Sequence, residues 1–218
     1  MENIILKSAR LIATDDESIK IIERLRSEEV YGQENNEWQL MNIVLVSSTE
    51  GVENIPNVLS KDSPAKRTVI IKTNQSLVVD DDANYYSVLS FFNDADVYKE
   101  IKTLLFLIRI NVEIYGLSGL DTNDFFTLTK GRKIISTVSY AYKDNIDEAF
   151  NELMKIKLQD DGKYLLFFTI EHYDSEGLAF DMLPVENFMN TFPKKATLYW
   201  NLSESSDKFV ILFTSISI

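Results

Sequence analysis

Residues 116–131 read GLSGLDTNDFFTLTKG, and this stretch carries the strongest local signal in the chain. Asp121 and Asp124 lie three residues apart, directly ahead of apolar residues typical of a helix. Carboxylates at the start of a helix accept hydrogen bonds from its free backbone amides and interact favourably with its dipole. Gly131 ends the segment, as glycine often does just beyond a helix. The stretch therefore predicts a short helix with an acidic start, and its two acids are the first candidates for a functional role.

The residues beyond this helix predict an alternation of strands and helices. The predicted segments are strands at 132–142 and 163–173, helices at 143–159 and 179–192, and two strands within 196–218. The apolar face of the first helix comprises Ile146, Ala149, Phe150, Leu153 and Met154, and Pro184 lies near the first turn of the second. A polar turn of four residues separates the last two strands, and this pattern indicates a β-hairpin.

The residues ahead of this helix predict a parallel α/β layer. The predicted segments are a strand within 3–13, a helix within 14–30 capped by Thr14 or Asp15, a strand at 39–48, a short helix at 49–61, a strand at 67–73 and a long helix over 97–114. The run at 39–48 is almost continuously apolar, as in a strand buried on both faces. Strands that alternate with short helices are typical of a parallel sheet.

Composition and charge exclude several classes of function. The chain has 218 residues, 45% of them hydrophobic, which is enough for a sizeable core. It contains no cysteine, so disulfides, thiolate metal sites and cysteine nucleophiles are excluded. The net charge of −12 disfavours nucleic acid and anionic membranes as partners.

The sequence also predicts a cytoplasmic protein without membrane insertion. Its first residues lack the cationic start and clean apolar stretch of a secretory signal. The longest apolar runs, TLLFLI and YLLFF, fall far short of the roughly 20 residues that a membrane helix needs.

Two other polar features receive no functional role. Asp80, Asp81 and Asp82 are consecutive, so they lack the alternating ligand spacing of a calcium loop and are typical of a solvated turn. His172 is the only histidine, and a metal cluster or a serine–histidine relay would depend entirely on it. No metal or cofactor is expected.

The second half of the chain resembles the tubulin/FtsZ superfamily, which includes the bacterial cell-division GTPase FtsZ. The order of acidic loop, short helix, strand, helix, strand, helix and strand pair is similar to the carboxyl-terminal half of FtsZ. In that family the loop reads roughly Gly-Leu-x-Asn-Val-Asp-x-x-Asp-Val. The matching positions here are Gly116, Leu117, Leu120, Asp121, Asp124 and Phe125. Gly131 then opens the next segment, GRKIISTVSYAY, at the family's spacing.

The resemblance implies a fold with three parts and a role for the acidic loop. The expected parts are a shortened α/β half at 1–96 with a parallel sheet, a connecting helix at 97–115 and an α+β domain with a mixed sheet at 116–218. In the family this loop reaches into the next subunit of a filament and helps to position the attacking water. Gly119 stands where the family has asparagine, and this departure weakens a catalytic interpretation.

The first half departs from the family where the family binds GTP. FtsZ-like GTPases surround the phosphates with glycine-rich loops, chiefly a Gly-Gly-Gly-Thr-Gly-Thr-Gly run after a strand, because glycine lets backbone amides approach closely. After the strand at 39–48 this chain reads SSTEGVEN, with one glycine and two glutamates. These glutamates would repel a triphosphate, so the sequence predicts that the nucleotide site is lost.

The preferred interpretation is a non-catalytic protein that acts through protein–protein contacts. It would associate with itself, or bind a filament-forming subunit, through the surface at 116–126. Two alternatives stay open. One is a GTP-binding enzyme with unusual phosphate loops, and the other is an α/β interaction module in which Asp121 and Asp124 merely cap a helix.

Overall fold

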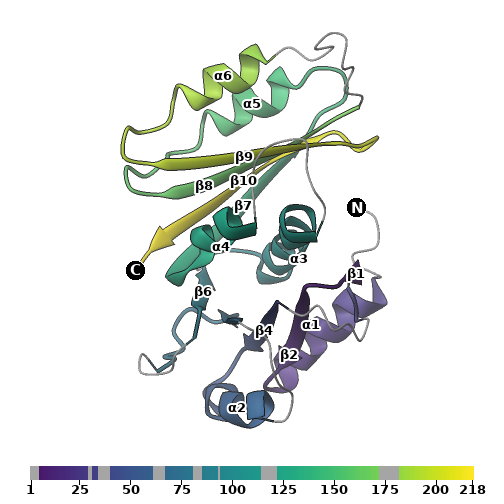
Figure 1. The fold of residues 1–218 in the computed structure, drawn as a ribbon, viewed down its shortest axis with the longest axis vertical. Helices are drawn as coiled ribbons and strands as arrows, with labels where there is room; N and C mark the ends of the chain where they lie inside the picture. Colours follow the sequence, from purple (N-terminus) through teal and green to yellow (C-terminus); the bar gives the residue numbers. More distant parts are fainter. Residues whose placement is uncertain are drawn as a thin grey trace.

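The structure is a computed structural model that describes residues 5–28, 31–33, 40–60, 67–80, 85–92, 94–113, 122–171 and 182–218 (Figure 1). The strands are β1 (Ile5–Leu6), β2 (Ala9–Ala13), β3 (Gly32–Gln33), β4 (Met41–Val46), β5 (Arg67–Lys72), β6 (Ser87–Phe91), β7 (Gly131–Ala141), β8 (Lys163–Ile170), β9 (Thr197–Glu204) and β10 (Phe209–Ser217). The helices are α1 (Asp16–Ser27), α2 (Thr49–Ser60), α3 (Val97–Ile108), the π-helix η1 (Arg109–Glu113), α4 (Thr122–Thr129), α5 (Asp147–Leu153) and α6 (Leu183–Met189).

Eight strands form one mixed sheet in the order β2-β4-β5-β6-β7-β10-β8-β9. The strands from β2 to β7 are parallel, β10 is antiparallel to both of its neighbours, and β8 pairs with β9 in parallel. The expected parallel layer and mixed sheet are both confirmed, and β6 joins them by pairing with β7 from Ser87↔Gly131 to Phe91↔Ile135. The short strand β6 was not predicted from the sequence.

The predicted hairpin of the last two strands is wrong. Both strands exist, but β10 lies between β7 and β8, and β9 pairs with the far side of β8. The polar turn at Ser205–Lys208 therefore crosses the end of β8 instead of joining neighbours. A short polar turn indicates that two strands are consecutive in the chain, whereas their pairing depends on which strand buries more apolar surface beside each of them. Here β8, with seven buried residues of its eight, occupies the position next to both.

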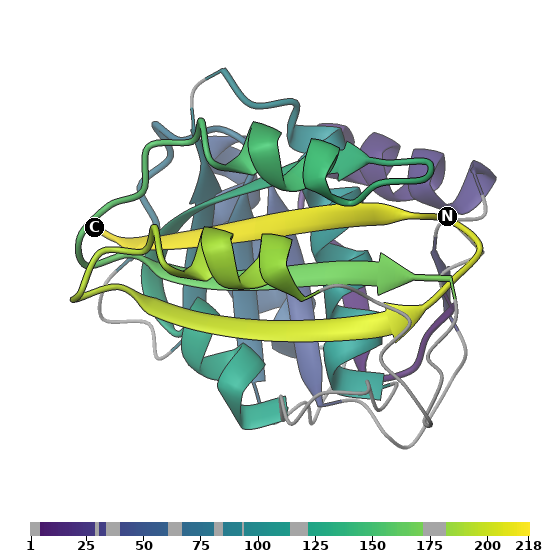
Figure 2. The ribbon, with the colours of Figure 1, turned by 90° about the horizontal axis from the view of Figure 1, so that it is seen from above.

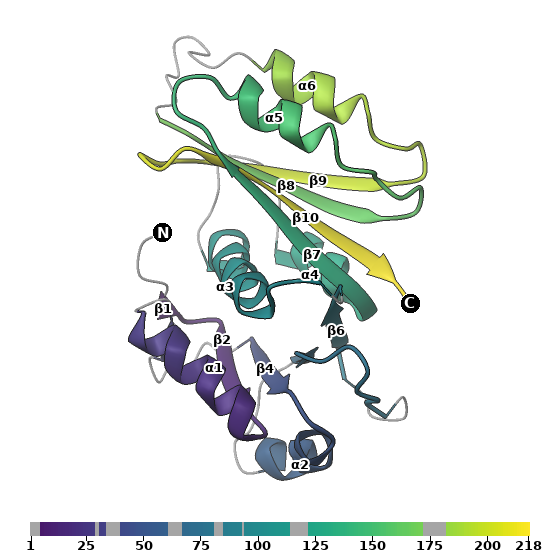
Figure 3. The same ribbon diagram turned by 180° about the vertical axis from the view of Figure 1, so that it is seen from behind.

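Helices cover both faces of the sheet and bury three apolar clusters. α1, α3 and α4 pack against one face, and α5 and α6 cover the opposite face of the carboxyl-terminal strands (Figures 1 and 2). α2 packs against β4 and β5 through Ile55 on the face turned away from α1. In Figure 3 the sheet twists between the strands near α1 and the strands beneath α5.

The long helix predicted over 97–114 is confirmed up to Glu113, with a change of geometry near its end. The chain is α-helical in α3 and continues as the π-helix η1. Glu113 Oε1 accepts hydrogen bonds from the backbone amides of Lys7 at 2.7 Å and Ser8 at 2.6 Å. The Ser8 hydroxyl donates to the same oxygen at 2.7 Å. The end of the connecting helix is thus fastened to the turn between β1 and β2. Ile114 lies outside the described residues.

The helix predicted over 143–159 is shorter in the structure, where α5 spans Asp147–Leu153. Its predicted apolar face is buried at Ile146, Ala149, Phe150 and Leu153, whereas Met154 is 39% exposed just beyond the helix end. Among the described helices, none is long and apolar enough to cross a membrane.

Candidate functional site

The carboxyl ends of β2 and β4 form the edge at which open α/β sheets usually bind ligands. β2 leads through Thr14 and Asp15 into α1, and β4 leads through Ser47 and Ser48 into α2. The two turns are adjacent because β2 and β4 pair in register from Ala9↔Met41 to Ala13↔Leu45. This edge is the place to look for a nucleotide or phosphate site.

Asp15 connects the two turns through both of its carboxylate oxygens. Oδ1 accepts a hydrogen bond from the Ser18 backbone amide at 2.9 Å, and the Ser18 hydroxyl in turn accepts the Asp15 amide at 3.0 Å. This reciprocal pair is the capping box of α1, so the prediction that Thr14 or Asp15 caps the helix is confirmed at Asp15. Oδ2 accepts the backbone amides of Ser47 at 2.8 Å and Ser48 at 3.0 Å. The Ser48 hydroxyl also lies 3.1 Å from Oδ2.

The carboxylate therefore occupies the amino end of α2 as well as that of α1. Backbone amides at a helix start have no partner within the helix and point toward an anion-binding position. The Ser48 amide, at the residue just before α2, and the Ser47 amide ahead of it already donate to Asp15. The protein's own carboxylate thus satisfies donors that could otherwise bind a phosphate oxygen.

Burial and hydrogen bonding act in opposite directions on the pKa of Asp15. Partial burial raises the pKa, because it disfavours the charged carboxylate. Hydrogen bonds from the backbone amides of Ser18 and Ser47, and from the hydroxyls of Ser18 and Ser48, lower it. The hydrogen bonds prevail, so the pKa of Asp15 lies below its usual value and the carboxylate is charged at neutral pH.

Gly51 in the first turn of α2 leaves the space that Asp15 fills. A Cβ atom at this position would lie 2.1 Å from Asp15 Oδ2 and 2.7 Å from the Thr14 hydroxyl. Further hydrogen bonds fix Thr14, since its hydroxyl donates to the Leu45 carbonyl at 2.9 Å and its carbonyl accepts Asn54 Nδ2 at 3.0 Å. The only glycine of the SSTEGVEN segment, Gly51, therefore makes room for the Asp15 side chain.

The surface around this junction is strongly acidic. A hollow of about 400 Å³ opens there. Its lining residues are Thr14, Asp15, Asp16, Glu17, Ile19, Ser47, Ser48 and Glu50. Four of these eight residues are carboxylates, and none of the described lining residues is a lysine or arginine. Because like charges repel strongly where water is partly excluded, this hollow disfavours a triphosphate.

The acidic segment at 116–131 is described only from residue 122 onward. Gly116, Leu117, Leu120 and Asp121 lie outside the described residues, so their predicted roles stay predictions. Asp124 is a half-buried acid in the first turn of α4, as expected for an acid near a helix start. Phe125 is 1% exposed and packs in the largest apolar cluster, so it holds α4 against the sheet.

Sequence reasoning missed an aromatic and cationic contact beneath α4. The Arg67 guanidinium lies 4.1 Å from the centroid of the Phe126 ring, and the Tyr86 hydroxyl donates to the Phe126 carbonyl at 3.0 Å. These contacts join α4 to the amino ends of β5 and β6. Asn123 and Thr127 are left exposed on the outer side of α4. Cation–π pairs between distant segments leave no periodic pattern in a sequence.

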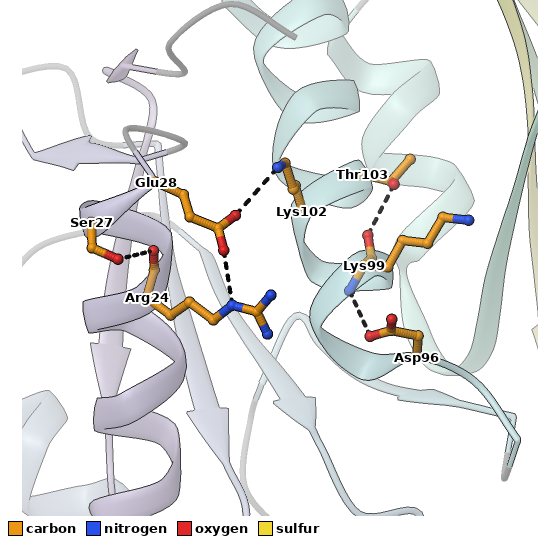
Figure 4. Close-up of polar contacts among 7 residues, drawn as sticks. All are labelled: Arg24, Ser27, Glu28, Asp96, Lys99, Lys102 and Thr103. Atoms are coloured by element: carbon orange, nitrogen blue, oxygen red, sulfur yellow. Dashed lines mark hydrogen bonds and ion pairs between the residues drawn. The ribbon is translucent and has the colours of Figure 1, made fainter. Parts of the chain in front are cut away.

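A polar network also joins α1 to α3, as Figure 4 shows. Glu28 accepts Arg24 Nε at 2.9 Å and lies 3.5 Å from Lys102 Nζ of α3. The Arg24 guanidinium covers the ring of Tyr98 at 3.7 Å. Burial and the nearby Glu28 carboxylate raise the pKa of Tyr98 to about 12. These groups connect two helices at the surface.

The two other polar features of the sequence, the aspartate run at 80–82 and His172, are not assigned a function. Asp80 is exposed, while Asp81, Asp82 and His172 lie outside the described residues. Within the described ranges, no group of three or more acids and histidines is placed to hold a metal ion.

Comparison with known proteins defines the class of fold. No family model matches the sequence, and no curated protein matches it. Among solved structures, an FtsZ mutant from M. jannaschii matches with a TM-score of 0.50 and 12% identity, over 91% of this chain and 68% of that one. CetZ2 from Haloferax volcanii, in a GTPγS-bound protofilament, matches with a TM-score of 0.50 and 10% identity, over 92% of this chain and 70% of that one.

TubZ from Bacillus thuringiensis serovar israelensis, in GDP-form protofilaments, matches with a TM-score of 0.51 and 10% identity, over 91% of this chain and 64% of that one. The chain therefore has the tubulin/FtsZ fold, in a form that spans about two thirds of these neighbours. The resemblance inferred from the acidic segment and the elements that follow it is confirmed at the level of the fold.

Proposed function

We propose that this protein is a non-catalytic relative of the filament-forming tubulin/FtsZ proteins that acts through protein–protein contacts and does not bind GTP. It would associate with its own kind or bind a filament-forming subunit. The observation that carries the proposal is the Asp15 carboxylate, which accepts the Ser47 and Ser48 amides at the amino end of α2.

The electrostatics of the same edge support the loss of nucleotide binding. A phosphate at this position would have to displace a charged carboxylate whose oxygens already have four donors. It would also face Asp16, Glu17 and Glu50 across the hollow. Displacing such an internal anion leaves it charged and unpaired, which is strongly unfavourable.

The position of α4 supports a role in contacts with other proteins. CetZ2 and TubZ are described in protofilaments, so the fold is compatible with assembly between subunits. The buried side chains of Phe125 and Phe126 pack α4 against the sheet, while Asn123 and Thr127 are exposed. A rigid, exposed element of this kind is suited to docking, because little conformational entropy is lost when it binds.

A double substitution tests whether Asp121 and Asp124 contact another protein or only cap α4. Asn caps a helix about as well as Asp, so Asp121→Asn combined with Asp124→Asn keeps the cap and removes both charges. We expect the double variant to fold normally and to lose association that wild-type protein shows without nucleotide, in analytical ultracentrifugation or in co-sedimentation with an FtsZ-type protein of the same cell. If the variant keeps every interaction of the wild type, the acids serve only as caps and this surface is not the contact. The matched control is Asp144→Asn combined with Glu148→Gln, which also removes two exposed negative charges but does so just ahead of α5 and within it, on the opposite face of the sheet.

A further inference from the structure

We propose that a cluster of lysines beside the carboxyl end of α4 binds a carboxylate-rich segment of a partner protein. This cluster, the lysine edge, consists of Lys130, Lys133, Lys163, Lys194 and Lys195. The inference rests on the proposed function, because it names the chemistry of the partner expected at the surface around α4.

The direction of the strands brings the five lysines to one edge of the sheet. β10 is antiparallel to β7 and to β8, and β9 is parallel to β8, so β7, β8 and β9 all begin at the edge where β10 ends. The register places Lys133 opposite Ser217 and Lys163 opposite Thr197. The other three lysines stand shortly before β7 or β9. Three strand spacings of about 4.8 Å separate β7 from β9, so the edge is about 15 Å wide.

The carboxyl end of α4 rests on this edge. Lys163 Nζ donates to the Thr127 carbonyl at 3.4 Å, and the Ser215 hydroxyl donates to the Leu128 carbonyl at 2.6 Å. In Figure 1 the end of β10 lies beside α4. Lysines interact favourably with the carboxyl end of a helix, but the helix dipole supplies only about half a negative charge there. The dipole therefore offsets only a small part of the positive charge of the lysine edge.

The lysine edge has few carboxylates of its own. Asp160 and Asp161 are exposed in the turn before β8. Within the described residues, no lysine of the edge forms an ion pair with these aspartates or with any other acid. Four lysines elsewhere in the described chain do form ion pairs, namely Lys20, Lys102, Lys155 and Lys208. A chain with a net charge of −12 thus keeps a local excess of positive charge beside α4.

Lys133 shows the effect of this excess on a buried side chain. Lys133 is 6% exposed, and its Nζ donates to the Ser217 hydroxyl at 2.5 Å. Burial lowers the pKa of Lys133, and the nearby Lys163 ammonium lowers it further. Asp161 acts on this pKa in the opposite direction but does not prevail. An acidic partner would bring the missing negative charge to both lysines.

The size of the lysine edge favours a short protein segment over a larger polyanion. An extended chain rises about 3.3 Å per residue, so about four or five residues would cover the width of the edge. A nucleic acid or an anionic membrane would extend beyond it, where the remaining charge of the chain is strongly negative and repels polyanions. Charge complementarity therefore points to a run of aspartates and glutamates on a protein.

The experiment measures the binding of a fluorescently labelled hexaglutamate peptide to the full chain by fluorescence anisotropy. We expect saturable binding that weakens strongly when the ionic strength rises from about 0.01 M to about 0.15 M, because the Debye length falls from about 30 Å to about 8 Å. A hexaglutamine peptide should not bind. Absence of hexaglutamate binding at the lower ionic strength, or binding that salt does not weaken, overturns the inference.

A double charge reversal tests where the peptide binds. Lys194 and Lys195 are exposed, so Lys194→Glu combined with Lys195→Glu should fold normally and bind hexaglutamate about tenfold more weakly. The matched control is Lys99→Glu combined with Lys143→Glu, which reverses exposed lysines in the first turn of α3 and beyond the far end of β7. The control should bind about as well as wild type. If it loses as much affinity as the test variant, only the net charge matters and the inference fails.

Other polyanions test the class of the partner. An oligodeoxythymidylate and vesicles that contain an anionic phospholipid replace the peptide in the same assay. We expect both to bind more weakly than hexaglutamate, because both extend beyond the lysine edge. Tighter binding of either one would show that the edge serves another class of partner and would overturn the inference.

Failure of this inference and failure of the proposed function are distinguishable. The variant with Asp121→Asn and Asp124→Asn keeps all five lysines, so it should still bind hexaglutamate. If wild type associates with a protein partner but does not bind the peptide, the inference fails and the proposed function stands. If the peptide binds but no protein association is found, the proposed function fails instead.

Discussion

At the scale of single residues, Asp15 carries more of the structure than a helix cap usually does. Its carboxylate accepts donors from α1 and from the turn before α2, so it holds two strand–helix junctions together. Replacement by alanine would leave the Ser18, Ser47 and Ser48 amides without this acceptor. We expect Asp15→Ala to lower the free energy of unfolding by about 2 to 3 kcal/mol, as measured by urea denaturation. Asp16→Ala, a change at the neighbouring exposed acid, should cost much less.

The pH dependence of stability follows from the lowered pKa of Asp15. A carboxyl group whose pKa is lower in the folded state contributes stability above its unfolded pKa, for which the ordinary value is 3.8. That contribution is lost as the pH falls through the folded pKa. We therefore expect the stability difference between wild type and Asp15→Asn to be constant near neutral pH and to shrink below about pH 4. A difference that stays the same down to the acid transition would contradict the charged role of Asp15.

Gly51 is predicted to be coupled to Asp15. A Cβ atom at Gly51 would lie 2.1 Å from Asp15 Oδ2, far inside contact distance, so Gly51→Ala must displace the carboxylate. We expect Gly51→Ala to destabilise the protein by about 2 kcal/mol although alanine favours helices. In the Asp15→Ala background the same substitution should cost less, because only the Thr14 hydroxyl, 2.7 Å from the added Cβ atom, still obstructs it. A double-mutant cycle measured by denaturation checks this, and additive effects would exclude the contact.

At the scale of elements, the sequence was sufficient to predict most helices and strands but not all of their partners. Continuous apolar runs identified β4 and β5, and periodicity identified α1, α3 and α5. The short strand β6 was missed because its pattern is brief and contains buried serines, Ser87 and Ser90. The predicted pairing of β9 with β10 was wrong because β8, an earlier strand, lies between them in the sheet. No local sequence pattern encodes which strand pairs with which.

The π-helix η1 gives an element-scale prediction. Glu113 at its end accepts the Lys7 amide, the Ser8 amide and the Ser8 hydroxyl through one oxygen. Glu113→Ala would release the turn between β1 and β2 from the connecting helix. We expect amide hydrogen exchange to accelerate at Lys7 and Ser8 and stability to fall by about 1 to 3 kcal/mol. Unchanged exchange at both amides would show that Glu113 does not hold this turn.

At the scale of the whole molecule, the sequence predicted the acidic character of the edge formed by the carboxyl ends of β2 and β4, but not the hydrogen bonds that Asp15 makes there. Two glutamates and a single glycine after β4 were visible in the sequence. The contact of Asp15 with Ser47 and Ser48 joins positions 32 and 33 residues apart, so it could only be seen once β2 and β4 were paired. The functional role of Asp121 and Asp124 is still a prediction.

The central proposal is that the protein keeps the tubulin/FtsZ fold but does not bind GTP, because its own Asp15 carboxylate accepts the backbone amides just ahead of α2. The most direct test is the binding of a fluorescent GTP analogue, with magnesium, to purified wild-type protein up to millimolar concentration. The internal anion at α2 predicts no saturable binding. Saturable binding that unlabelled GTP displaces would contradict the account and restore a GTPase as the function.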